Sequence, residues 1–192
     1  SSILKENFGS TESIKTINKI RKACVNIGFF QVTGHGISKK QIQRVCNVGI
    51  KFFKSTEQNK RKLAPKKWNK LNSNVYRGYF PSDVNGKEGL DIGDPMISSM
   101  FVKKNKRKKI ERLNLSKSLN KNSISIIKKY YSGIFKLSEL LFKIIISISK
   151  KDHELSKTAF QRVRTLSTLR FNYYPKQEKP VEISKEDGVA LG

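Results

Sequence analysis

The hydrophobic positions along the chain recur with the period of an α-helix in three stretches. Residues 11–27 form the first stretch, which is followed by Gly28, a residue type that commonly terminates helices. The second stretch begins at Ser38, the first residue of a capping-box pattern, and continues to Phe53. The third and most regular stretch covers residues 123–150. We predict an amphipathic helix in each.

Shorter segments between these helices predict one more helix and several strands. Ser55 opens a second capping-box pattern, and Pro65 stops the short helix that follows it. Strands are predicted where β-branched and aromatic residues gather between turn residues. The predicted strands cover residues 29–33, 76–80, 97–102 and 166–174, and a further strand is expected to begin at Val189.

The charge balance is strongly basic and is most biased in one segment. The net charge is +25, with 40 Lys and Arg residues against 15 Asp and Glu residues. Residues 103–121 have few apolar positions to bury, and we predict a mobile basic insertion there. The run from Lys103 to Lys109 also fits a nuclear import signal, a pattern that arises by chance in Lys-rich chains.

A basic balance of this size can indicate a nucleic-acid partner. However, the aromatic residues do not alternate with basic residues, as they do in proteins that bind single strands. Basic residues are also spread over the predicted surface helices. We therefore interpret the charge as compositional drift or an aid to solubility, and nucleic-acid binding stays as an alternative.

The cysteines and the longest apolar stretch bear on the compartment. Cys24 and Cys46 each lie on the apolar stripe of a predicted helix, so we expect buried free thiols and a reducing, cytoplasmic location. The apolar stretch at residues 134–148 contains three charged residues. It is too polar and too short to span a membrane.

Two segments carry a resemblance to a known family. Residues 28–37 read GFFQVTGHGI, and residues 166–175 read LSTLRFNYYP. In this order and at this spacing, with Phe52 and Phe53 between them, they resemble the isopenicillin N synthase-like family of non-haem iron oxygenases, most of which use 2-oxoglutarate. The resemblance implies an α+β fold, in which an N-terminal helical region packs on an incomplete double-stranded β-helix, or jelly roll.

The resemblance covers nearly the whole chain outside the basic segment and divides it into four regions. Residues 1–102 resemble the N-terminal region of a non-haem dioxygenase, and residues 103–121 are the expected insertion. Residues 122–165 are expected to hold the long helix and its connection, and residues 166–192 the first strands of a truncated oxygenase barrel. The chain therefore looks like a fragment.

The same resemblance implies an Fe(II) site whose ligands this chain does not carry. The family binds iron through a His-x-Asp pair and a distal His, which are expected beyond residue 192. The chain has two histidines, His35 and His153, and neither has an acidic residue two positions downstream. A facial triad needs two His and one carboxylate. We therefore expect no metal ligand in this chain and no oxygenase activity from it alone.

The cosubstrate residues are expected within the chain. In family members that use 2-oxoglutarate, the Asn and the second Tyr of the NYYP motif contact it, which assigns this role to Asn172 and Tyr174. Amide and phenol groups can both hydrogen-bond a carboxylate. Alternation along a strand places these two side chains on one face and Tyr173 on the other.

Candidate substrate residues come from an earlier segment. Residues 76–79 resemble a loop of the peptide-cyclising members, in which an Arg pairs with a substrate carboxylate, so Arg77 and Tyr79 are the candidates. A guanidinium suits such a bidentate contact. The resemblance also suggests that Glu88 and Asp91 lie near the mouth of the cavity, without a fixed chemical role.

The function implied for the intact protein is oxidation of a small organic substrate by molecular oxygen, with Fe(II) and 2-oxoglutarate as cofactors. Two alternatives remain: a non-catalytic relative that acts as an interaction module, and a basic nucleic-acid-binding protein. A His-x-Asp pair and a distal His in the rest of the gene would identify the enzyme. Salt-dependent binding to DNA or RNA would support the last alternative.

Overall fold

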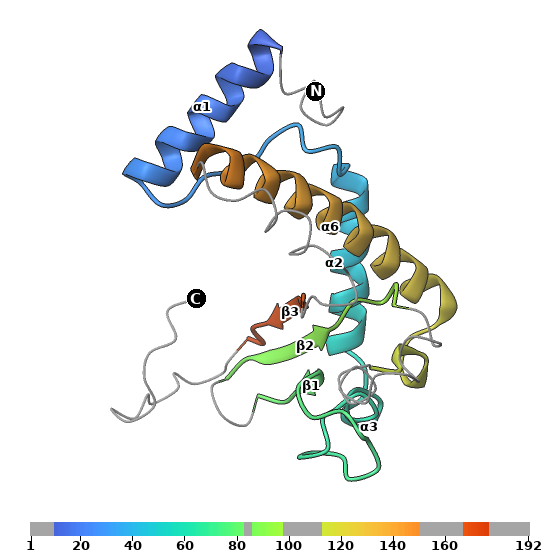
Figure 1. Ribbon diagram of the computed structural model, residues 1–192. Helices are drawn as coiled ribbons and strands as arrows, with labels where there is room; N and C mark the ends of the chain where they lie inside the picture. The colour runs from blue at the N-terminus through green and yellow to red at the C-terminus, as the bar shows by residue number, and fades with distance from the viewer. Residues whose placement is uncertain (1–9, 83–85, 98–112, 150–166, 177–192) are drawn as a thin grey trace.

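The computed structural model describes residues 10–82, 86–97, 113–149 and 167–176 (Figure 1). Helices and strands are combined in an α+β arrangement, which confirms the predicted α+β class, while the predicted jelly roll stays a prediction. In chain order the elements are α1 (Thr11–Asn26), α2 (Lys39–Phe53), α3 (Glu57–Arg61), β1 (Gly78–Phe80), β2 (Glu88–Ile92), the 3₁₀ turn η2 (Leu115–Lys117), α6 (Lys121–Ser149) and β3 (Leu169–Tyr173).

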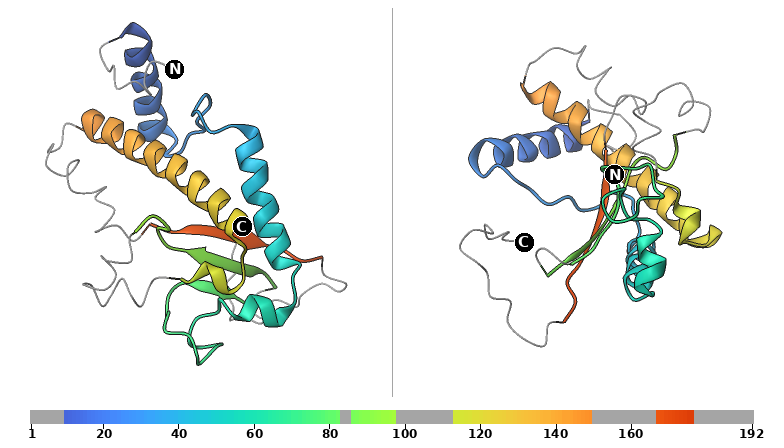
Figure 2. Two further views of the ribbon diagram at one scale, coloured as in Figure 1. Left: turned by 90° about the vertical axis from the view of Figure 1, so that its right-hand side faces the viewer. Right: turned by 90° about the horizontal axis from the view of Figure 1, so that it is seen from below.

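The three strands form one antiparallel sheet with β2 in the centre. Tyr79 of β1 lies opposite Leu90 of β2, which lies opposite Phe171 of β3. Figure 2 shows α2 and α6 on the same side of this sheet, and α2 contacts both α6 and β3. Helix α1 contacts α6 and lies farther from the sheet. The described residues therefore form a helical layer over one sheet face.

The core lies between the helices and the sheet face that carries Tyr79 and Leu90. Both residues are 1% exposed, and Ile127 of α6 is fully buried. The ring of Phe52 in α2 lies edge-to-face on the ring of Tyr79, with centroids 5.8 Å apart. Aromatic pairs of this geometry contribute about 0.5–1.5 kcal/mol beyond the burial of their surface. This packing buries one face of the sheet against the helices.

Side-chain caps begin the three shorter helices. The hydroxyl oxygens of Ser10, Ser38 and Thr56 each accept a bond from a backbone N–H three residues later. The cap predicted at Ser38 is confirmed, whereas α3 begins one residue later than predicted. The reason is that the Ser55 hydroxyl donates to the carbonyl oxygen of Phe52 at the end of α2, at 2.7 Å.

The long helix predicted at residues 123–150 is confirmed as α6, which covers Lys121–Ser149. It buries residues spaced along one side, namely Ile127, Tyr131, Phe135 and Ile144. Among the helices of the described ranges, none is long and apolar enough to cross a membrane.

The strand predictions differ from the structure in two respects: one predicted strand is not formed, and one strand was not predicted. Residues 29–33 form no strand, and Phe29 is 74% exposed, because no strand of the described residues lies beside this segment to pair with it. Strand β2 was not predicted, because Glu88 and Asp91 interrupt its apolar pattern. Residue 97 is not in a strand, and residues 98–102 lie outside the described residues. The strand expected at Val189 lies outside them as well.

The prediction of a mobile basic insertion at residues 103–121 is wrong for residues 113–121. Leu115 is 7% exposed and belongs to the core. The Lys117 ammonium donates to the Asn72 side-chain oxygen at 2.6 Å, and the Ser118 hydroxyl donates to the Asn59 carbonyl oxygen at 3.0 Å. Residues 113–121 therefore pack against the fold, and residues 103–112 lie outside the described residues.

The two cysteines are free, as predicted, but their burial differs from the prediction. Cys24 is half-buried and Cys46 is exposed. Val45 and Val48 occupy the buried side of α2 instead. Cys46 directly follows Val45, and one residue of rotation turns it away from the core.

We predict that Gly78→Ala destabilises the protein by more than about 2 kcal/mol. Gly78 has φ +121°, and a Cβ built there would collide with the carbonyl oxygen of Leu63. Gly28 is the matched control, because it has φ +87° and no atom within 4 Å of a built Cβ. Gly28→Ala should cost only about 1–2 kcal/mol. Denaturant midpoints measure the stability of both variants, and equal losses of stability would contradict the collision at Gly78.

Candidate functional site

The face of the sheet opposite the helices, called the outer face below, carries the candidate cosubstrate residues. Along β3 and the residue that follows it the burial alternates: Phe171 and Tyr173 are half-buried, whereas Asn172 and Tyr174 are exposed, the latter by 62%. The ring of Tyr173 stacks on Phe53 of α2, with centroids 5.1 Å apart. The predicted facing is therefore confirmed, while the cosubstrate role of the two exposed side chains stays a prediction.

A glycine, Gly89, occupies the centre of the outer face and places no side chain there. Gly89 of β2 lies between Phe80 of β1 and Asn172 of β3 in the sheet register. A Cβ built on Gly89 would meet Phe80 at 3.8 Å, which is an ordinary contact. Phe80 in turn packs edge-to-face against Trp68 at 5.6 Å. The outer face thus has no side chain at its centre, with an aromatic pair on one side and an amide on the other.

Asp91 and Arg170 lie opposite each other on the same face and form a two-pronged ion pair. Nε and Nη2 of Arg170 donate to Oδ1 and Oδ2 of Asp91, both at 2.6 Å. The bonds to Asp91 raise the pKa of Arg170. The side chain of Asp91 is 4% exposed and that of Arg170 is 60% exposed. Arg170 therefore covers a buried carboxylate while part of its guanidinium faces outward.

The two substrate candidates are not brought to the outer face together. Arg77 is 8% exposed, and its Nη1 donates to the hydroxyl of Thr168, just before β3. Tyr79 points to the helix side of the sheet, where its hydroxyl lies 2.8 Å from Glu88. These positions separate Arg77 and Tyr79 from Asn172, and their substrate role stays a prediction.

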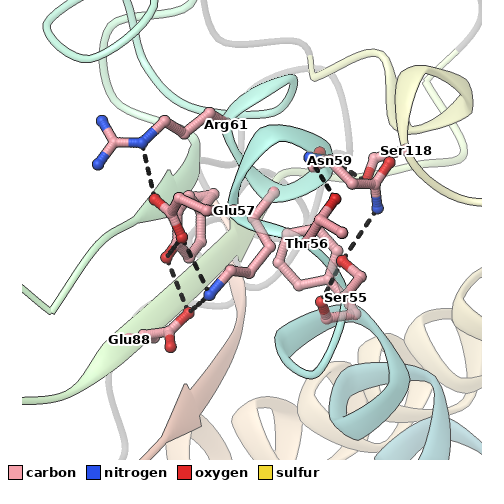
Figure 3. Close-up of polar contacts among 10 residues, drawn as sticks. Ser55, Thr56, Glu57, Asn59, Arg61, Glu88 and Ser118 are labelled. Atoms are coloured by element: carbon pink, nitrogen blue, oxygen red, sulfur yellow. Dashed lines mark hydrogen bonds and ion pairs between the residues drawn. The ribbon is translucent and has the colours of Figure 1, made fainter.

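Tyr79 belongs to a charge cluster in which Lys60 and Glu88 are also buried and Glu57 is exposed. The Lys60 ammonium lies 2.6 Å from Glu88 and 3.1 Å from Glu57. The Tyr79 oxygen lies 2.8 Å from Glu88 and 3.2 Å from Glu57. Figure 3 shows Glu88 reaching from β2 toward Glu57 on α3, with Arg61 on the outer side of Glu57. The cluster connects α3 to β1 and β2.

The cluster holds its groups in defined protonation states. Burial alone lowers the pKa of Lys60, but the bonds with Glu88 and Glu57 outweigh it and raise the pKa above 10.5. Burial tends to raise the pKa of Glu57, yet Lys60 lowers it overall. Burial and the carboxylate of Glu88 raise the pKa of Tyr79 well above its ordinary value. A charged Lys60 and a neutral Tyr79 therefore donate to two carboxylates.

The described residues do not provide an iron site. No group of three His, Cys, Asp or Glu side chains within the described ranges could hold a metal ion. Nδ1 of His35 accepts a bond from the backbone N–H of Ile37 at 3.2 Å, which stabilises the turn between α1 and α2. His153 lies outside the described residues. The expectation that ligands follow residue 192 stays a prediction.

Comparison with known proteins identifies the family to which this chain belongs. Residues 4–123, more than half of the chain, match the family described as "non-haem dioxygenase in morphine synthesis N-terminal". The chain therefore belongs to this family of non-haem dioxygenase N-terminal regions, as the resemblance of its motifs had indicated.

Similar proteins extend the match toward the C-terminus. Isopenicillin N synthase from Amycolatopsis lactamdurans is 25% identical over 173 residues, covering 87% of this chain and 52% of that protein. Flavonol synthase 3 from Arabidopsis thaliana is 28% identical over 166 residues, covering 83% and 49%. The crystal structure of a rice dioxygenase for auxin oxidation shares the fold, with a TM-score of 0.61 at 17% identity, covering 86% of this chain and 48% of that one. The chain spans about half the length of these relatives.

Sequence reasoning missed two groups that the structure makes prominent. Arg170 lies two positions before Asn172, so strand alternation alone places it on the same face. Its pairing with Asp91 could not be predicted, because β2 was not recognised as a strand. Lys60 gave no signal, because a Lys in a short basic helix is ordinarily exposed.

We predict that Lys60→Met destabilises the protein by about 3–5 kcal/mol, because it leaves the buried Glu88 carboxylate without its cation. Arg61→Met is the matched control, because Arg61 also binds Glu57 but is 40% exposed. It should cost less than about 1 kcal/mol. Denaturant unfolding measures both. Lys60→Met/Glu88→Gln should recover part of the loss, and equal costs for the two single variants would contradict the cluster's role.

The raised pKa values of Lys60 and Tyr79 predict a loss of stability at alkaline pH. Each contribution is complete below the unfolded pKa, 10.5 for Lys60 and 10.0 for Tyr79, and disappears as the pH rises through the higher folded value. Denaturant midpoints should therefore fall above about pH 10. The fall should be shallower in Lys60→Met, and identical slopes in both proteins would contradict this linkage.

Proposed function

We propose that the intact protein is a non-haem Fe(II)-dependent oxygenase that uses 2-oxoglutarate to oxidise a small organic substrate. The observation that carries the proposal is the exposure of Asn172 and Tyr174 on the outer face, while Tyr173 between them packs on α2. This is the facing that a pocket wall requires. Membership of the non-haem dioxygenase N-terminal family supports the same class of reaction.

The residues of the outer face fit a carboxylate ligand such as 2-oxoglutarate. The amide of Asn172 and the hydroxyl of Tyr174 can donate hydrogen bonds to carboxylate oxygens. Both side chains are anchored on a strand whose other face is fixed by the Tyr173–Phe53 stack. In the intact protein, 2-oxoglutarate would supply the electrons that oxygen activation needs beyond those taken from the substrate. The contribution of this chain is to bind and orient that cosubstrate.

The described residues do not form a ligand set for the iron. We propose that the ligands follow in the remaining half of the protein, where they would complete a jelly-roll barrel with the described sheet as one wall. Two names support the cofactor assignment: "2-oxoglutarate-dependent dioxygenase" in Didymella fabae and "2-oxoglutarate-Fe(II) type oxidoreductase" in Aspergillus fumigatus, 31% and 24% identical to this chain.

The proposal is tested with Tyr174→Phe in the intact protein. This substitution removes one hydrogen bond to a charged group, worth about 1.5–3 kcal/mol, and little volume. We expect the apparent affinity for 2-oxoglutarate to fall by about ten- to a hundredfold, with an unchanged Tm. The measurement is 2-oxoglutarate-dependent turnover over a concentration series.

Tyr173→Phe is the matched control, because it keeps the ring that stacks on Phe53. It should leave the affinity for 2-oxoglutarate unchanged. If the two variants behave alike, the cosubstrate assignment is wrong. If Tyr174→Phe weakens binding of the organic substrate and leaves binding of 2-oxoglutarate unchanged, the protein works in the manner of isopenicillin N synthase. Absence of any 2-oxoglutarate or substrate oxidation by the wild-type protein would favour a non-catalytic interaction module.

A further inference from the structure

We propose that the loop between α3 and β1, residues 62–76, docks the protein on a membrane surface that carries anionic lipids. Figures 1 and 2 show this loop projecting below α3, at the end of the described structure remote from α1. The proposal does not rest on the proposed function, because no residue of the loop is assigned a part in binding substrate or cosubstrate. Docking of this kind is peripheral and needs no spanning helix.

The α3–β1 loop is held in a fixed shape by its own polar groups. The backbone N–H of Lys66 donates to the carbonyl oxygen of Asn74 at 2.8 Å, which joins the two ends of the segment 66–74. Asn72 is 5% exposed, and its side-chain amide donates to the carbonyl oxygen of Ala64 at 2.7 Å. Compact loops whose ends meet in this way are frequently functional.

This fixed loop holds apolar side chains out in the solvent. Leu71 is 92% exposed, Val75 is 48% exposed and Tyr76 is 69% exposed. One exposed apolar side chain is ordinary on a protein surface, but these lie close together within residues 71–76 and form a local patch. Leucine and tyrosine are both suited to the interfacial region of a bilayer, which accommodates apolar side chains and the polar tip of a phenol.

Basic side chains accompany this apolar patch. Lys66, Lys67 and Lys70 are exposed, and residues 58–82 contain no Asp or Glu. Clusters of lysine are attracted to anionic headgroups, and the long side chains reach the headgroups while their stems lie along apolar surface. The same uniform charge repels a second copy of the loop. The α3–β1 loop therefore combines the charge and the apolar tip that peripheral membrane binding requires.

The surroundings of Trp68 favour a membrane over a nucleic acid. Proteins that bind single strands stack successive bases on aromatic side chains. Here the Lys67 ammonium lies 4.8 Å from the centroid of the Trp68 ring, and Phe80 packs edge-to-face against that ring at 5.6 Å. Tyr76 is the one other aromatic residue of the loop, and Leu71, its most exposed apolar residue, has no ring to stack on a base.

The test measures co-sedimentation of the intact protein with vesicles of phosphatidylcholine, alone or with about one-third phosphatidylserine. We expect binding to the anionic vesicles, weakening as the salt concentration rises, and no binding to the neutral ones. Lys66→Gln/Lys67→Gln/Lys70→Gln should weaken binding by about a hundredfold, because each Lys near such a surface contributes about fivefold. Leu71→Ser should weaken it by about tenfold.

Matched control variants separate this loop from the overall basic charge. Lys128→Gln/Lys129→Gln/Lys136→Gln removes the same charge from exposed positions of α6. Val25→Ser removes an apolar side chain that is 75% exposed on α1. Both controls should bind the anionic vesicles as the wild-type protein does. All substituted side chains are exposed, so every variant should keep the wild-type Tm.

The outcomes that overturn the proposal are distinct. One is absence of vesicle binding by the wild-type protein, and another is an equal loss of binding in the loop variants and their controls. A third is binding to poly(U) RNA that the triple loop variant loses, with vesicles left unbound, which would identify a nucleic-acid surface. Failure of the proposed oxygenase function would appear in turnover alone and would leave vesicle binding intact.

Discussion

The buried ion pair between Lys60 and Glu88 is the interaction on which the arrangement of the described elements depends. Both side chains are removed from water, at 9% and 10% exposure. Desolvating two charges costs several kcal/mol, and only a complete set of close partners offsets that cost. Tyr79 and Glu57 supply the remaining partners. The pair is therefore satisfied only when α3, β1 and β2 are all in their native positions.

Strand β2 has a charged residue on each face of the sheet, and both are paired. Glu88 faces the helices and lies opposite Tyr173, whereas Asp91 faces outward and lies opposite Arg170. Because alternate residues of a strand point to opposite faces, one short strand is anchored by an ion pair on each side. A shift of one residue in its pairing would exchange the two faces and bury the wrong groups. The register that places Asn172 outward is thus fixed by charge as well as by packing.

The division of the sheet into a packed face and a polar face accounts for how the site is built. The aromatic contacts of Phe52 with Tyr79 and of Phe53 with Tyr173 pack α2 against one face of the sheet. The opposite face carries the hydrogen-bond donors of Asn172 and Arg170, with Gly89 between the strands that bear its other side chains. Rigid strands hold polar groups more accurately than loops do, which suits the role proposed for this face in binding 2-oxoglutarate.

The sequence by itself determined the helices, the family and the facing of the NYYP strand. Helical periodicity marked α1, α2 and α6 because each has a continuous apolar stripe, and alternation placed Asn172 and Tyr174 together because the period of a strand is two. Only the tertiary structure revealed β2, the burial of Lys60 and the Asp91–Arg170 pair. Lys60 and Glu88 are 28 residues apart in the chain, and Asp91 and Arg170 are 79 apart. A charged residue in a sequence reads as exposed, and only the fold shows which opposite charge makes its burial possible.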